Sequence, residues 1–308
     1  MSIRIEDLVS FVATVHHQSL SRAAEALGLT QPAVTRRIQS LEEGLGSTLL
    51  DRDTKPPKPN ALGRRVFAQC EQVLREVDNL KALVESKATP QGKLSLGVTQ
   101  AVAEIGVREL LDVFSSHYQS LDISIGTRWS NELVRQVDLG EIDAATVMLP
   151  AGTDFPPSLV ARHLRPIEML VVCAAGRWPE RPEPYRLYDL RNSKWIVNPD
   201  GCGFRARLQR ALGDLGLPFQ VAMDAFGTEL QLQFVSEGLA LGLATRAQLE
   251  RSRYRDGIRI LPVTDFNPST ELWLIHNRVP GNLKHPIDLF GETVSSIFTG
   301  QDKKSSGS

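Results

Sequence analysis

Hydrophobic residues recur at helical spacing through the first 45 positions of the chain. The pattern predicts an amphipathic helix that ends near His17, a second helix capped by Ser19 or Ser21, and a third that begins after Thr30. On the third predicted helix, a stripe with spacings of four, three and four residues should face inward: Val34, Ile38, Leu41 and Leu45. The opposite side of this helix is therefore left for solvent or a partner.

That opposite side is polar near the start of the helix. It carries Gln31, Thr35, Arg36 and Gln39. An arginine can donate two parallel hydrogen bonds to guanine, a glutamine can pair with the edge of adenine, and a threonine methyl can touch the thymine methyl group. Such a helix suits the DNA major groove. A three-helix bundle whose polar face is merely solvated explains the same pattern and stays open at this point.

The segment SLSRAAEALGLTQPAVTRRIQSLEEGLGSTLLDR, residues 19–52, resembles the winged helix-turn-helix of LysR-type transcriptional regulators. The resemblance implies base-reading or phosphate contacts for four residues and a wing contact with the DNA backbone or minor groove for the fifth: Gln31, Pro32, Thr35, Arg36 and Arg52. The next residues, DTKPPKPNALG, depart from the family pattern. Three prolines there weaken any regular wing ladder.

A long helix without proline is predicted from Asn60 to about Ser86. Its apolar residues repeat at alternating spacings of four and three: Val66, Cys70, Val73, Val77, Leu80 and Val84. Such a seam is typical of pairing with a second copy of the chain, although packing against the helix's own domains is the alternative. The resemblance implies a linker helix in a homodimer or in a homotetramer built as a dimer of dimers. Cys70 is expected to be a core residue rather than a redox switch.

Strands and helices alternate after a hinge at residues 89–92. The pattern predicts a two-lobed α/β domain with mostly parallel sheets. The motifs GKLSLGVTQ, GEIDAATV and SEGLALGLATR extend the resemblance to roughly residues 3–300, and the family's effector domain resembles type 2 periplasmic binding proteins. The predicted multi-domain α/β organisation is a winged helix-turn-helix at 1–59, a linker helix at 60–88, an effector domain at 89–300 with lobe I at about 91–162 and 266–300 and lobe II at about 163–265, and a disordered tail at 301–308.

Loops that follow strands and open helices should line a cleft between the lobes, because ligands of open α/β sheets collect at the carboxyl ends of strands. The candidate effector-binding residues share this position: Thr99, Gln100, Ser130, Gly203, Phe204 and Thr228. By the family resemblance, Thr99 matches a position that commonly meets a small and often anionic effector. As an alternative, Thr99, Ser130 and Thr228 serve as helix caps, and the two roles can coexist.

Composition narrows these expectations without naming a partner. A net charge of −1 and a hydrophobic content of 42% describe an ordinary globular protein, so DNA binding has to rest on where the charges lie. No apolar stretch approaches the roughly 18 residues of a membrane span, and the polar N-terminus is unlike a signal peptide, so we expect a cytoplasmic protein without a membrane partner. The three cysteines lie far apart, and neither a metal-ligand spacing nor a cofactor motif is found.

The predicted function is a sequence-specific transcriptional regulator that binds double-stranded promoter or operator DNA and responds to a small, anionic effector between the lobes. The alternative is a small-molecule-binding protein or an enzyme with a periplasmic-binding-protein-like fold. The six histidines are scattered and Cys202, in the turn at 201–204, has no recognisable base partner, so no enzyme is expected. A binding protein alone would leave the first 88 residues unexplained.

Overall fold

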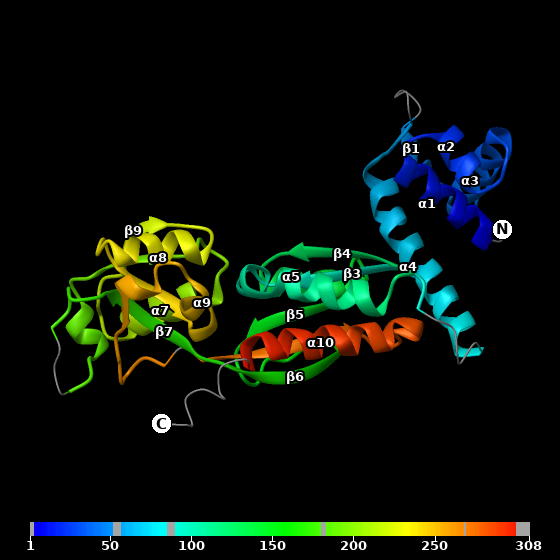
Figure 1. Ribbon diagram of the computed structural model, residues 1–308. Helices are drawn as coiled ribbons and strands as arrows, with labels where there is room; N and C mark the ends of the chain where they lie inside the picture. Colours follow the sequence, from blue (N-terminus) through cyan, green and yellow to red (C-terminus); the bar gives the residue numbers. More distant parts are fainter. Residues whose placement is uncertain (1–2, 52–56, 85–89, 180–182, 268, 300–308) are drawn as a thin grey trace. The chain divides into compact units, whose positions relative to one another are not determined.

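The structure, a computed structural model, describes residues 3–51, 57–84, 90–179, 183–267 and 269–299. The chain divides into two compact units, Met1–Ala88 and Thr89–Ser308, which are described separately. The elements of the first unit are labelled in Figure 1: α1 (Ile5–His17), α2 (Leu20–Ala26), α3 (Gln31–Leu45), β1 (Leu50–Asp51), β2 (Lys58–Pro59) and α4 (Ala61–Val84).

Side-chain caps fix where the helices of the first unit begin. The Ser19 hydroxyl accepts from the Arg22 amide at 3.3 Å, and the Thr30 hydroxyl accepts from the Ala33 amide at 3.4 Å. These bonds satisfy amides that have no partner within the helix. The predicted inward stripe of α3 is buried at three positions, Val34, Ile38 and Leu41. Its fourth member was wrongly predicted to be buried: Leu45 is 40% exposed, because it is the last residue of α3, where the chain turns away.

Helix α4 has two different sides along its length. Its first half packs into the core of the first unit, where Cys70 is only 4% exposed. Burial, together with the neighbouring charge of Glu71, raises the pKa of the Cys70 thiol to about 11, so the thiol remains neutral. Farther along the helix, Val73 is 39% exposed and Leu80 is 65% exposed. The predicted seam is therefore shared between the helix's own domain and an uncovered apolar strip.

The second unit contains two five-stranded sheets, each in its own lobe. The first has the strand order β4-β3-β5-β12-β6. The bounds of its strands are β3 (Gly92–Val98), β4 (Leu121–Thr127), β5 (Ala144–Leu149), β6 (Leu159–Ile167) and β12 (Thr270–Asn277). Strand β3 is parallel to β4 and β5, whereas β12 is antiparallel to β5 and β6.

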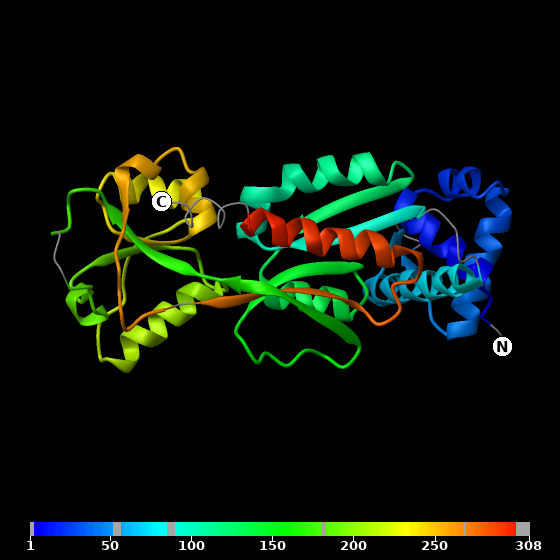
Figure 2. The ribbon, with the colours of Figure 1, turned by 60° about the horizontal axis from the view of Figure 1, so that its bottom comes forward.

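Helices cover both faces of the first sheet. Helices α5 (Gln100–His117) and α10 (Lys284–Thr299) lie side by side on one face, as Figure 2 shows, and α6 (Ser130–Asp138) covers the other. Successive residues of β5 alternate between these faces: Ala144 and Met148 pack with α5 and α10, and the intervening Ala145 and Val147 pack with α6. Burial on both sides explains why this strand is apolar throughout.

The second sheet has the order β11-β7-β10-β8-β9. The bounds of the elements in this lobe are β7 (Met169–Ala174), β8 (Lys194–Val197), α7 (Gly203–Asp214), β9 (Gln220–Asp224), α8 (Thr228–Ser236), β10 (Leu241–Thr245), α9 (Arg246–Arg251) and β11 (Ile258–Ile260). Trp195 is fully buried in the core on the α7 side, and the next residue, Ile196, is buried on the α8 side.

The chain passes between the lobes at two places. Strands β6 and β7 are separated by Glu168 alone, and residues 261–269 connect β11 back to β12 (Figure 2). The predicted boundary at about residue 163 falls inside β6, which stays paired with β12 as far as Ile167. Strands next to these crossings run antiparallel to their neighbours, so both sheets are mixed and the prediction of mostly parallel order was wrong.

Candidate DNA-binding surface and ligand cavity

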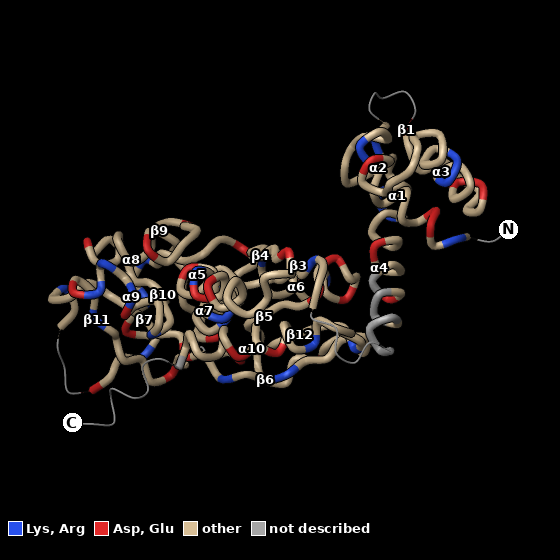
Figure 3. Tube along the Cα trace, turned by 45° about the vertical axis from the view of Figure 1, so that its right-hand side comes forward, with Lys and Arg blue, Asp and Glu red and all other residues tan. Residues whose placement is uncertain are grey.

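The polar side of α3 is open to solvent. Gln31, Pro32 and Arg36 are exposed, and Thr35 is partly buried. On the reverse side, Val34 and Ile38 are 0% and 3% exposed. Figure 3 shows basic residues on this helix. The structure thus places four of the five predicted DNA-contacting residues on one accessible surface.

The contacts of these four side chains differ. The Gln31 side-chain oxygen accepts from the Ser21 hydroxyl at 3.0 Å, which ties the start of α3 to α2. The Thr35 hydroxyl donates to the Gln31 carbonyl at 3.0 Å, within the helix. Arg36 bonds to none of the described residues, so its guanidinium is available to an external acceptor. Of the four, Arg36 is therefore the side chain best prepared to bind guanine or phosphate.

The fifth predicted DNA-contacting residue, Arg52, lies outside the described residues. The described part of the wing is a short antiparallel ladder in which Leu50 pairs with Pro59 and Asp51 pairs with Lys58. The buried carboxylate of Glu42 holds the chain that leads into this ladder, because it accepts from the amides of Leu49 and Leu50 at 2.7 and 3.3 Å. The sequence analysis did not single out Glu42, since a charged residue next to an apolar stripe is usually solvated.

A cavity of about 130 Å³ lies between the two lobes of the second unit. Its lining comes from strand ends and helix starts of both lobes. All six predicted effector-binding residues are among the lining residues: Thr99, Gln100, Ser130, Gly203, Phe204 and Thr228. The structure therefore brings the predicted residues together, and their contact with a ligand stays a prediction.

Thr99 has the most distinctive environment in the cavity. It follows β3 at the N-cap position of α5, but its side chain makes no capping hydrogen bond. The residue is 7% exposed, and its hydroxyl is buried without a hydrogen-bond partner among the described residues. Because buried polar groups are normally paired, this hydroxyl points to a ligand contact more than to a capping role.

The other two hydroxyl groups are already bonded within the protein. The Ser130 hydroxyl donates to the Met148 carbonyl and accepts from the Met148 amide, both at 3.0 Å. The Thr228 hydroxyl accepts from the side-chain nitrogen of Gln248 at 2.6 Å. Ser130 therefore joins α6 to β5, and Thr228 joins the start of α8 to α9.

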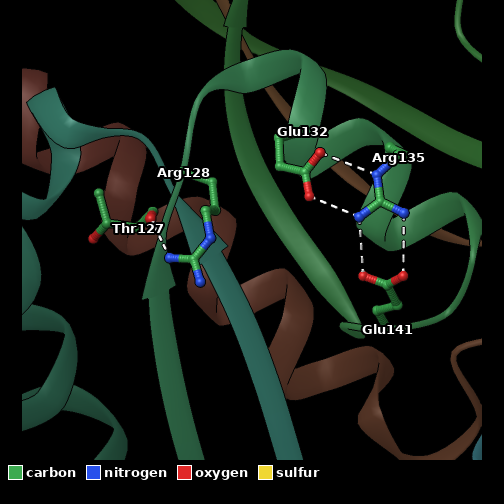
Figure 4. A network of polar contacts seen from close by, with 5 residues as sticks. All are labelled: Thr127, Arg128, Glu132, Arg135 and Glu141. Atoms are coloured by element: carbon green, nitrogen blue, oxygen red, sulfur yellow. Dashed lines mark hydrogen bonds and ion pairs between the residues drawn. The ribbon is translucent and has the colours of Figure 1, made fainter. Parts of the chain in front are cut away.

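Ion pairs hold α6 beside the cavity (Figure 4). Arg135 bonds to Glu132 at 2.7 and 3.0 Å and to Glu141 at 3.1 and 3.3 Å. The hydrogen bond from Arg135 lowers the pKa of Glu132, and both carboxylates raise the pKa of Arg135. Before the helix, the Arg128 guanidinium donates to the Thr127 carbonyl at 2.7 Å. These contacts tie α6 to the turn that follows it and so help to position its first residue, Ser130.

Three helices begin at the cavity without a side-chain cap. Their N-cap residues are Thr99 for α5, Trp129 for α6 and Cys202 for α7, and each of these lines the cavity. The first amides of such helices are free and lie at the positive end of the helix dipole. Arg207 on α7 adds a positive charge, and no other lysine or arginine lines the cavity in the described part of the chain. The site is thus suited to a small anion.

Several lining residues were not predicted from the sequence. They include Trp129, Asn198, Arg207, Gln248 and Thr270. Arg207 could have been found, because it lies one helical turn after Gly203 and so shares its face of α7. Gln248 and Thr270 had no local signal, since they come from α9 and β12, which lie far from the other lining residues in the sequence.

Two family models match the chain. Residues 5–64 match the model described as bacterial regulatory helix-turn-helix protein, lysR family, and residues 87–280 match the LysR substrate binding domain. Curated relatives include the HTH-type transcriptional regulators SoxR of Arthrobacter sp. (strain TE1826) and GltR of Bacillus subtilis (strain 168), each 25% identical to this chain. The alignment with SoxR covers 96% of this chain and 97% of SoxR, and the alignment with GltR covers 92% and 99%.

Solved structures share the fold. Full-length OxyR from Pseudomonas aeruginosa is 16% identical, has a TM-score of 0.76 and matches over 96% of this chain and 95% of that one. Full-length CbnR in complex with its target DNA is 18% identical, has a TM-score of 0.58 and matches over 96% and 99%. From the two family models, we conclude that the chain belongs to the lysR family of bacterial helix-turn-helix proteins and is a DNA-binding transcriptional regulator with a LysR-type substrate-binding domain.

Proposed function

We propose that this regulator reads its DNA site with α3 and responds to a small organic anion bound in the cavity between the lobes. The observation that carries the ligand proposal is the buried hydroxyl of Thr99, which has no partner among the described residues and lies at the open N-terminus of α5. A carboxylate placed there would accept from this hydroxyl and from free helix amides. For the DNA contacts, the proposed residues are Gln31, Pro32, Thr35 and Arg36, with Arg52 in the wing.

The cavity also limits the size and polarity of the ligand. A cavity of about 150 Å³ is large enough to hold benzene, so about 130 Å³ suits a molecule built on one ring or a short carbon chain. Met148, Met169 and Leu243 provide an apolar wall, and Arg207 provides a positive charge. Small carboxylic acids combine these features. We therefore expect a monocarboxylate with an apolar body rather than a large or strongly cationic ligand.

Replacing Thr99 with valine should abolish or strongly weaken the response to the effector while DNA binding persists. Valine keeps the shape of the side chain and removes the hydroxyl, and the loss of a hydrogen bond to a charged ligand costs about 1.5–3 kcal/mol, or at least about tenfold in affinity. The measurement is a thermal-shift screen of organic, aromatic and amino acids on the full chain, because a ligand that binds only the folded state raises the melting temperature.

The matched control for this screen is Thr127→Val, on β4 and outside the cavity lining. It should retain the ligand-induced shift. Since the Thr99 hydroxyl makes no bond to a described residue, the ligand-free melting temperature of Thr99→Val should not fall. An unchanged ligand affinity in Thr99→Val would remove this residue from the site.

We further propose that the cavity binds its ligand without transforming it. Cys202 lines the cavity, but no histidine, aspartate, glutamate or lysine does so in the part of the chain that the structure describes. A thiol needs a neighbouring base or a positive environment to act as a nucleophile. The absence of a base among these lining residues favours a ligand sensor over an enzyme.

We propose that the exposed apolar strip of α4 pairs with a second copy of the chain in a homodimer, which can assemble further into a tetramer. Replacing Leu80, 65% exposed, with glutamate should shift the protein towards monomers, because it places a charge in the paired surface. Sedimentation analysis measures the shift. Leu215→Glu, at a site 50% exposed in the second unit, should leave the assembly unchanged, and an unchanged assembly in Leu80→Glu would exclude this strip.

The site of action follows from the DNA-binding role. No helix in the described ranges is long and apolar enough to cross a membrane. Because a DNA-binding regulator has to reach the chromosome, we propose that it works in the cytoplasm.

A further inference from the structure

A carboxylate on α5 bridges the two lobes beside the cavity. Glu104 accepts from the Thr228 amide at 2.9 Å and from the Gln248 side-chain nitrogen at 3.1 Å. Both partners belong to the lobe opposite α5. Glu104 also accepts from Gln100 at 3.1 Å, within its own helix. One exposed side chain on the first lobe therefore joins the starts of α8 and α9 on the second.

The second lobe holds its side of this bridge in a fixed position. The Gln248 side-chain oxygen accepts from both the amide and the hydroxyl of Thr245 at 3.0 Å, in a capping box at the start of α9. The side-chain nitrogen of Gln248 is consequently turned towards Thr228 and Glu104, with the Thr228 hydroxyl at 2.6 Å. Since the amide of Gln248 is oriented before the lobes meet, little side-chain freedom is lost when it binds the carboxylate.

The bridge also changes the chemistry of α8. Helices α5, α6 and α7 begin at the cavity without a side-chain cap, whereas the first amide of α8 already donates to Glu104. A carboxylate at this position is favoured by the helix dipole. The protein thus supplies its own anion to one of the helix starts around the cavity. The N-terminus of α8 is therefore not available to a carboxylate of the effector.

A second contact between the lobes lies next to the first. The Arg251 guanidinium of α9 donates to the carbonyl of Ile105, the residue after Glu104. Consecutive residues of α5 are thus tied to the opposite lobe, one through its side chain and the other through its backbone.

We infer that Glu104, Thr228 and Gln248 form a latch that keeps the lobes closed before any effector binds. Hydrogen bonds to a charged group are the stronger class, and these two join surfaces that otherwise meet around a cavity. Thr228 and Gln248 line the cavity as well, so the latch sets the shape in which the effector finds it. The regulator therefore rests in a closed state that effector binding adjusts, instead of closing only when the effector arrives.

Trp129 offers a probe for lobe opening in the ligand-free protein. It belongs to the first lobe and stacks on Phe226 of the second, with ring centroids 6.1 Å apart and an angle of 24° between the rings. Opening of the lobes would separate these rings and expose the indole. Acrylamide quenching of tryptophan fluorescence in the full-length chain measures this exposure as the Stern–Volmer constant.

The experiment compares Glu104→Ala with Glu109→Ala, an exposed residue of the same helix that bonds to none of the described residues. Glu104→Ala should raise the Stern–Volmer constant, and the rise should vanish when Trp129 is also replaced by phenylalanine. Adding Arg251→Ala should raise the constant further. Glu109→Ala should match the wild type.

Glu104→Gln, which has the same size, tests the latch without removing the side chain. Its amide nitrogen cannot accept from Gln248, so it should show a smaller rise than alanine, and it decides the question if circular dichroism shows that Glu104→Ala is misfolded. Quenching equal to the wild type in the folded variants, or a rise that persists without Trp129, would overturn the latch. Neither effector nor DNA is used, so this result is independent of the proposed ligand.

Discussion

Replacing Arg36 with alanine should lower the affinity for the specific DNA site and relax the preference for one base pair. Arg36 is exposed on α3, and its guanidinium bonds to none of the described residues. A bidentate contact between arginine and guanine contributes about 1–3 kcal/mol of discrimination, which corresponds to about a five- to 150-fold effect. Binding titrations with the specific site and with sites changed at single base pairs measure both affinity and preference.

Arg210→Ala is the control for this substitution. Arg210 is also exposed and bonds to none of the described residues, but it lies on α7 of the second unit. It removes the same charge from the chain and should leave the base preference unchanged. If Arg36→Ala lowered affinity equally for every sequence, Arg36 would contact phosphate alone. If it changed neither affinity nor preference, α3 would not be the recognition helix.

Replacing Gly63 with alanine should destabilise the DNA-binding unit by about 3 kcal/mol, at the upper end of overpacking effects. A Cβ atom at this position would lie 2.0 Å from the Leu49 carbonyl oxygen and 3.0 Å from its carbon. The Leu49 oxygen is held in place because it accepts from the Asn60 amide at 3.0 Å. Backbone atoms on both sides therefore leave little room for adjustment. Calorimetric unfolding of the full chain measures the change.

Gly213→Ala is the matched control for Gly63→Ala. Gly213 also lies in a helix, and nothing lies within 4 Å of the Cβ that alanine would add. Since alanine favours the helix over glycine, this change should leave stability unchanged or raise it by up to about 1 kcal/mol. Equal melting temperatures for Gly63→Ala and the wild type would mean that the start of α4 can move away from Leu49.

Features with a local cause were predicted well from the sequence. The caps at Ser19 and Thr30 are confirmed, because a capping residue acts on amides three residues away. The predicted cap at Asn60 is also confirmed, since its side-chain oxygen accepts from the Gly63 amide at 2.7 Å. The exposed side of α3 followed from its apolar stripe. Leu45 failed because periodicity alone does not tell where the covering helices end.

Features that depend on distant pairing were predicted less well. The antiparallel place of β12 is determined by its partners β5 and β6, and its own sequence gives no sign of them. For the same reason Gln248 and Thr270 were missed in the cavity. The six predicted lining residues were found because strand ends meet at one edge of a sheet. The sequence could not tell that Ser130 and Thr228 spend their hydroxyls on protein partners, while Thr99 does not.

The place of β12 in the first sheet has a consequence for how the protein is made. This strand pairs Glu271 with Leu149, and the whole second lobe lies between them in the chain. During synthesis the second lobe can therefore finish folding while the first still lacks β12 and α10. Because loops of more than about a hundred residues have to close before these pairs form, refolding of the first lobe should be the slower step.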